Sequence, residues 1–122
     1  MHDVTAGAHT VVVDEPRDRG GTDTGPTPNE LLGMSLASCT AITIEMYAGR
    51  KGWEVGEVQV EVDYALDPRK GRSSYDVAVK VAADLDDEQL ERIRVIAGRC
   101  PVHRLLVGKA EIHDSVERFP TR

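Results

Sequence analysis

Cysteine and aromatic residues are scarce in this sequence of 122 residues, and each scarcity excludes a class of protein. One Trp, three Tyr and one Phe make up 4% of the chain, so the aromatic platforms that stack single-stranded nucleic acid are not expected. The formal net charge of −6 points the same way, because nucleic-acid phosphates attract basic surfaces. We therefore expect no nucleic-acid partner.

Long hydrophobic runs and a secretion signal are also missing. The longest stretch without a charged residue covers residues 31–44, which is shorter than a membrane-spanning helix requires. The first residues, MHDVTAGAHT, show no basic segment followed by an apolar one, so no secretion signal is expected. These features predict a cytoplasmic protein without a membrane partner. In that reducing compartment two cysteines favour a working thiol over a structural disulfide.

The first half of the chain predicts a strand, a loop and a long helix. Residues 9–14, HTVVVD, are β-branched enough for a strand, and the Gly- and Pro-rich residues after them predict a loop. Thr27 as N-cap, Pro28 at the first helical position and Glu30 three residues after the cap predict a helix start. The helix is expected to stop at one of the glycines that follow, Gly49 or Gly52.

This helix is apolar on nearly all of its sides. Glu30 and Glu45 are its only charged residues before Arg50. A helix that is apolar all round belongs in the centre of a larger structure, and a chain of 122 residues can hardly cover it alone. We therefore expect a homodimer that wraps around the helix.

The second half predicts a hairpin, two helices and a final strand. Apolar residues recur at every second position in two runs, which are Val58, Val60, Val62 and Tyr64, then Tyr75, Val77, Val79 and Val81. Asp86 or Asp87 starts a helix that ends at Gly98, and Cys100 caps a short one. Residues 110–118, AEIHDSVER, predict the last strand. The order is β-α-β-β-α-α-β, a single α+β domain over residues 1–122 in which an antiparallel sheet covers the helices.

The two cysteines lie 61 positions apart in different settings. From the residues alone they are inert buried side chains, half of a metal site, or a redox pair assembled by the fold. Cys100 at a helix N-terminus has the partial positive charge that favours a thiolate. Cys39 lies about three turns inside its helix, beyond the reach of that charge. Its activation would need a cation or a hydrogen-bond donor from another segment.

Two motifs give the sequence a family resemblance. Residues 25–40, GPTPNELLGMSLASCT, place a cysteine eleven residues after the proline of a helix start, and residues 100–106, CPVHRLL, follow far downstream. Together they resemble the OsmC/Ohr family, the osmotically inducible and organic hydroperoxide resistance proteins. The resemblance implies an intertwined homodimer with two long central helices back to back inside the antiparallel sheets. It also implies two active sites at the subunit interface.

The same resemblance implies a thiol-dependent peroxidase. By it, Cys39 attacks the O–O bond of an organic hydroperoxide and becomes a sulfenic acid, which Cys100 resolves as a disulfide. A dithiol reductant, lipoyl-type or a small thiol, then resets the pair. No metal or other cofactor is implied, because sulfur itself carries the oxidation.

Family members hold the reactive thiolate with an arginine that a glutamate orients. The arginine lies twenty residues before the cysteine in the OsmC branch, which is Arg19 here; a solvated loop charge is the alternative. The glutamate lies ten residues before the cysteine, where this chain has Asn29 followed by Glu30. Glu30 either orients Arg19 or only completes the capping box with Thr27. Relatives also begin with an additional strand, which is not expected here.

Two other functions stay open. The Asn29 departure and the short N-terminus are compatible with a non-enzymatic dimer that binds a small apolar ligand or acts as a redox sensor. A metal site built from Cys39, His103 and His113 is weaker, because the spacing matches no zinc signature. A surface or capping role is expected for His103. The remaining large side chains are expected in the core or lining a pocket: Met34, Met46, Tyr47 and Trp53.

Overall fold

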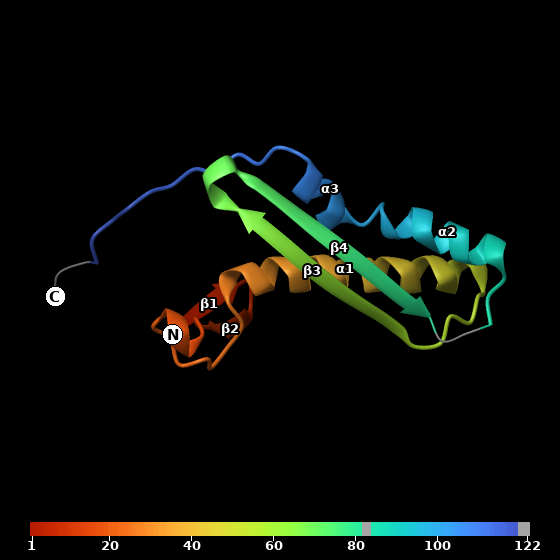
Figure 1. Ribbon diagram of the computed structural model, residues 1–122, viewed down its shortest axis with the longest axis horizontal. Helices are drawn as coiled ribbons and strands as arrows, with labels where there is room; N and C mark the ends of the chain where they lie inside the picture. Colours follow the sequence, from red (N-terminus) through yellow and green to blue (C-terminus); the bar gives the residue numbers. More distant parts are fainter. Residues whose placement is uncertain (82–83, 120–122) are drawn as a thin grey trace.

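The computed structural model describes residues 1–81 and 84–119. Its elements are β1 (His2–Ala6), β2 (His9–Val13), η1 (Arg17–Arg19), α1 (Pro28–Lys51), β3 (Val58–Asp67), η2 (Pro68–Lys70), β4 (Arg72–Val81), α2 (Asp87–Ala97) and α3 (Pro101–Val107). The β3–β4 hairpin crosses α1, α2 and α3 follow α1 along its length, and β1–β2 lies at the start of α1 (Figure 1). This is an α+β fold with antiparallel sheets, as the sequence predicts.

Helix α1 is fixed by caps at both ends. Glu30 N donates to Thr27 Oγ1 at 3.1 Å, and Thr27 N donates to Glu30 Oε1 at 3.0 Å, which confirms the predicted capping box. Gly52, at φ 69°, ends the helix in the left-handed conformation that glycine adopts without strain. The helix therefore runs to the later of the two predicted glycines.

The β3–β4 hairpin pairs its apolar residues directly across the sheet. Val58 lies opposite Val81 and Tyr64 opposite Tyr75, with the predicted valines between them in the same register. One face of this hairpin packs on α1. The core beneath it is formed by Ile44, Ala48, Val55 and Ile93, with Trp53, Val58, Val79, Val81, Leu85 and Ala97 packed against it.

Helices α2 and α3 begin as the sequence predicts. Asp86 caps α2, and Gln89 completes a second capping box. Gly98 follows the last residue of α2. Cys100 is the N-cap of α3, with Pro101 in the first turn.

The predicted strand order is wrong at both ends of the chain. An additional strand, β1, pairs antiparallel with β2, and the turn between them contains Gly7 at φ +61°. All five β1 residues are exposed, so no buried alternation announces this strand. Residues 110–118 lie extended but pair with no strand among the described residues. Figure 1 shows this segment leading away from the rest of the chain. The observed order is β-β-α-β-β-α-α.

Only one stripe of α1 is buried within the chain. The buried residues are Gly33, Leu36, Thr40, Ile44 and Ala48. The opposite side keeps four large apolar side chains 46–56% exposed, namely Leu32, Met34, Ile42 and Met46. Met34 and Met46 are therefore not core residues of the single chain, but Met34 lines a pocket between α1 and β3, which is the other expected place for it. By length and composition alone α1 could also cross a membrane, a property that core helices of soluble proteins share.

Candidate functional site

Cys100 is buried at the junction of α1 and α3. Its side chain is 0% exposed, and its Sγ accepts a hydrogen bond from His103 N at 3.2 Å. The hydroxyl of Thr40, on α1, lies 3.7 Å from the same sulfur. Pro101 starts α3 immediately after the cysteine, so the thiol points back at the free N–H groups of the first turn. This confirms the predicted capping position.

Cys39 lies in the middle of α1, one residue before Thr40, and is half-buried. Consecutive residues of a helix point about 100° apart, so Cys39 and Thr40 project from different sides of α1. The fold therefore carries Cys100 to the turn of α1 that holds Cys39, across 61 positions of sequence. The contact that joins the two segments is made through Thr40, which sequence analysis missed because an interior helix threonine carries no distinctive signal.

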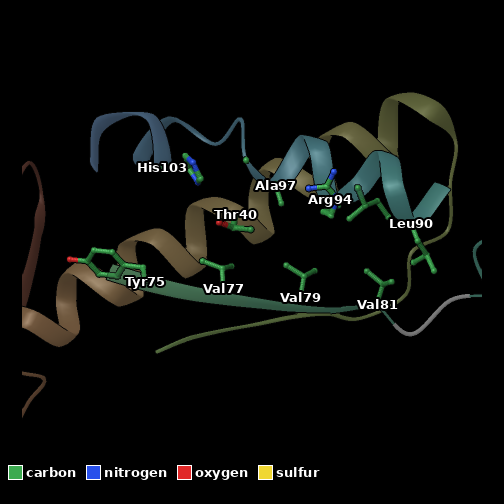
Figure 2. Close-up of a pocket in the computed structure, with 11 residues that line it drawn as sticks. Thr40, Tyr75, Val77, Val79, Val81, Leu90, Arg94, Ala97 and His103 are labelled. Atoms are coloured by element: carbon green, nitrogen blue, oxygen red, sulfur yellow. The ribbon is translucent and has the colours of Figure 1, made fainter. Parts of the chain in front are cut away.

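An apolar groove of about 560 Å³ opens beside this junction. Figure 2 shows Val77, Val79 and Val81 rising from β4 towards α2, with Thr40 on the far wall. His103 of α3 lies at one end of the groove, and Arg94 of α2 lies towards the other end. The Arg94 guanidinium is also bound to Glu91, with Nε 3.0 Å from Oε2. Such walls suit the alkyl part of a ligand, and the end near His103 is next to Cys100.

Arg19 and Glu30 line a second cavity, of about 590 Å³, at the start of α1. Asn29 lies in its wall as well. Arg19 ends the short helix η1, and its side chain is exposed. Glu30 Oε1 is held by Thr27 N, so the capping role of this carboxylate is confirmed. Within the described ranges, 1–81 and 84–119, no salt bridge joins Arg19 to Glu30.

The four predicted site residues thus form two groups on one chain. Cys39 lies nine helical positions after Glu30, which is about 13 Å along the axis at 1.5 Å per residue. Neither cysteine lines the Arg19 cavity. The structure brings Arg19 to Glu30 and the Cys100 segment to that of Cys39, but it does not bring the two groups together.

The alternative metal site is not assembled. Among the residues that the structure describes, no group of three or more His, Cys, Asp or Glu side chains could hold a metal ion. His103 takes part in the α3 cap through its backbone N–H, which fits the predicted capping role. His113 lies in the extended C-terminal segment, 3.7 Å from Glu111.

Asp14 is a further buried polar residue that sequence analysis did not single out. It is 5% exposed and follows β2 at the start of the loop that carries Arg19. Hydrogen bonds from Thr24 and Thr22 hold the pKa of this carboxyl well below its usual range. The signal was an acidic residue directly after a strand, followed by threonines at alternate positions 22 and 24.

These features define an α+β protein with one thiol in the middle of a long helix and a second thiol capping a short helix against it. The family model described as OsmC-like protein matches residues 21–113, and the chain belongs to that family. The resemblance read from the two cysteine motifs is confirmed.

Individual relatives agree with this assignment. The chain is 31% identical over 86 residues to an uncharacterised protein of Haloferax volcanii, a match that covers 69% of this chain and 65% of that protein. A crystal structure from Psychrobacter arcticus, provisionally described as an osmotic stress induced and detoxification response protein, is 26% identical with a TM-score of 0.71; the match covers 80% of this chain and 72% of that one.

A third relative shares the fold. The organic hydroperoxide resistance protein OsmC of Legionella pneumophila is 23% identical with a TM-score of 0.61, over 84% of this chain and 77% of that chain. At this identity the similarity shows a shared fold, and the hydroperoxide-resistance description is that of the Legionella protein.

Proposed function

We propose that the protein is a thiol-dependent peroxidase that reduces organic hydroperoxides. One observation carries this proposal: the fully buried thiol of Cys100 lies against Thr40, which is the direct neighbour of Cys39 and itself lines the wall of an apolar groove. A two-cysteine peroxidase needs its two thiols on neighbouring segments beside an apolar groove, and the contact between Cys100 and Thr40 supports that arrangement. Family membership supports the same chemistry.

The reaction has three balanced steps. The Cys39 thiolate attacks the terminal peroxide oxygen, the O–O bond breaks, and the alkoxide leaves and takes up a proton as the alcohol. Cys39 is then a sulfenic acid, which the Cys100 thiol attacks to form a disulfide and release water. A dithiol of lipoyl type, or two molecules of a small thiol, reduces that disulfide to the two cysteine thiols and is itself oxidised to a disulfide. The protein needs no further cofactor for these steps.

A homodimer completes the site in this proposal. The exposed apolar side of α1 is the surface that a second copy covers, since such a stripe is costly to leave in water. The extended segment after α3 supports an intertwined arrangement, with Ile112 78%, Val116 97% and Phe119 96% exposed in the single chain.

Two-fold symmetry also accounts for the 13 Å between the two groups of site residues. If two α1 helices pack antiparallel and cross between Met34 and Ser35, residue 39 of one chain faces residue 30 of the other. Both residues at that crossing are exposed. Each active site then takes Cys39 and Cys100 from one chain and Arg19 with Glu30 from its partner.

Thiol chemistry gives the direct test. Adding cumene hydroperoxide to the reduced protein is expected to convert two free thiols per chain into one disulfide. Cys39→Ser abolishes turnover, whereas Cys100→Ser leaves a sulfenic acid on Cys39 that dimedone labels, detected by mass spectrometry. Free thiols that stay unchanged after peroxide treatment contradict the proposal.

A non-enzymatic apolar-ligand binder or redox sensor is the competing function. The capping bond of Glu30 favours it, because a carboxylate held by Thr27 N is less available to orient an arginine. Alkylation at pH 6 separates the two, since an unactivated thiol is almost silent there. The cytoplasmic location and the single domain over residues 1–122 stay predictions.

A further inference from the structure

The loop between β2 and α1 is organised around a single carboxylate. Asp14 Oδ1 accepts from Glu15 N at 2.9 Å. Asp14 Oδ2 accepts from both the N–H and the hydroxyl of Thr22, at 3.0 and 2.8 Å, and from the same two groups of Thr24, at 3.2 and 2.8 Å. The amino group of Met1 also lies 3.2 Å from Oδ1. A side chain with this many donors ties both ends of the loop to one point.

The backbone of the loop is shaped to make this convergence possible. Asp23, between the two threonines, has φ +55°, a conformation that non-glycine residues rarely adopt and that the two flanking bonds hold. A Cβ on Gly21 would lie 1.9 Å from the carbonyl oxygen of Glu15, and one on Gly25 would lie 2.1 Å from that of Val12. Glycine at both positions lets the chain pass close enough for the threonines to reach the carboxylate.

Arg19 lies in the segment between Glu15 and Thr22, two of the residues whose N–H groups Asp14 binds. The η1 turn begins two residues after the Glu15 N–H that Asp14 binds and ends three residues before Thr22. Within it, Arg19 N donates to Pro16 O at 3.0 Å, and Gly21 N donates to the same oxygen at 3.1 Å. The Arg19 backbone is therefore fixed while its side chain is free to reach across the cavity at the start of α1.

We infer that Asp14 is a positioning residue, which holds the Arg19 loop in the one shape that presents the guanidinium to the reactive thiol. This inference rests on the proposed function, because it assigns to Arg19 the stabilisation of the Cys39 thiolate. A flexible loop would spread an exposed arginine over many positions and dilute its charge at the thiol. The carboxylate itself touches neither peroxide nor sulfur.

The test follows Cys39 in a Cys100→Ser background, so that it is the only thiol of the chain. Iodoacetamide alkylation at pH 6 reports its thiolate fraction. Asp14→Asn presents an amide N–H₂ to donors and is expected to slow alkylation about tenfold, as loss of one nearby cation does. Arg19→Gln is expected to do the same. The double variant is expected to be no slower than Arg19→Gln, because Asp14 acts only through that arginine.

Matched controls separate positioning from general loss of structure. Asp86→Asn removes the same charge from a capping carboxylate on α2 and is expected to alkylate like the parent. Thr24→Val removes one hydroxyl donor to Asp14, whereas Thr5→Val removes a hydroxyl that faces Thr10 at 3.1 Å on the neighbouring hairpin. Only Thr24→Val is expected to slow alkylation, and circular dichroism checks that each variant is folded.

Three results would overturn the inference, and they differ from failure of the proposed function. Asp14→Asn alkylating like the parent overturns it. So does a double variant that is slower than Arg19→Gln, because Asp14 then acts by another route. If Asp14→Asn does not fold, Thr24→Val takes its place, and an alkylation rate of Thr24→Val equal to that of the parent overturns the inference. If the parent and Arg19→Gln are equally silent at pH 6, the proposed function fails and the positioning role falls with it.

Discussion

Subunit complementation tests the composite site most directly. Co-expression of an Arg19→Gln chain and a Cys39→Ser chain with different affinity tags yields mixed dimers. In such a dimer, one site combines Cys39 and Cys100 of the first chain with Arg19 of the second, so it is intact. The other site carries both lesions. If Arg19 and Cys39 acted within one chain, each site would carry one lesion and none would work.

The magnitude follows from the geometry. Glu30 and Cys39 are nine residues apart, about 13 Å along α1, and Arg19 lines the cavity at the Glu30 end of that helix, so in the proposed dimer it serves the Cys39 of the partner. The purified mixed dimer therefore has one working site of two and forms disulfide at about half the wild-type amplitude at pH 6. The two parent homodimers react at least about tenfold more slowly or not at all.

A second mixed dimer gives the matched control. Cys100 contacts Thr40 of its own chain, so we expect the two thiols of one proposed site to belong to one chain. A dimer that pairs Cys39→Ser with Cys100→Ser is expected to form no disulfide, because each site lacks one of its thiols. Non-reducing mass spectrometry after a brief pulse of cumene hydroperoxide counts the disulfides. An inactive Arg19→Gln and Cys39→Ser dimer, or a disulfide in the control dimer, refutes the reasoning.

Three further predictions concern stability and titration. Ile44 is 1% exposed, and Ile44→Ala is expected to lower the free energy of unfolding in urea by about 2–5 kcal/mol. Ile42 is 55% exposed, so Ile42→Ala is expected to leave subunit stability nearly unchanged but to weaken the dimer, as measured by analytical ultracentrifugation. The Arg92 Nε–H donated to Tyr47 Oη at 2.9 Å lowers the pKa of that phenol, so part of the tyrosinate absorbance at 295 nm is expected to rise at a lower pH than in the Arg92→Gln variant. Because the pKa of Asp14 is depressed in the folded state, its stabilisation is complete above about pH 4 and lost as pH falls further; the stability difference between wild type and Asp14→Asn should be constant at neutral pH and shrink in acid.

The features that the sequence determined by itself are local ones, each confined to a single helical turn or a single strand. Both capping boxes join residues three positions apart, Thr27 with Glu30 and Asp86 with Gln89. Such a box needs only the first turn of its helix, so the local sequence determines it. The valines of β3 and β4 alternate with polar residues, so the sequence pattern places them on one face of the hairpin, which is largely half-buried in the single chain. Cys100 as a cap is a local feature of the same kind, whereas the sequence left the end of α1 open between Gly49 and Gly52.

Only the tertiary structure decided which distant segments meet. The exposed β1 strand has no buried alternation and is held by pairing with β2, which no local pattern announces. Residues 110–118 have strand composition but find no strand partner among the described residues, since a strand needs a neighbour to bond. Cys100 contacts Thr40 in the middle of α1, whereas Arg19 and Glu30 line one cavity at the start of that helix. The type of a residue determines which chemistry its side chain can perform. The packing of distant segments determines which side chains lie close enough to act together.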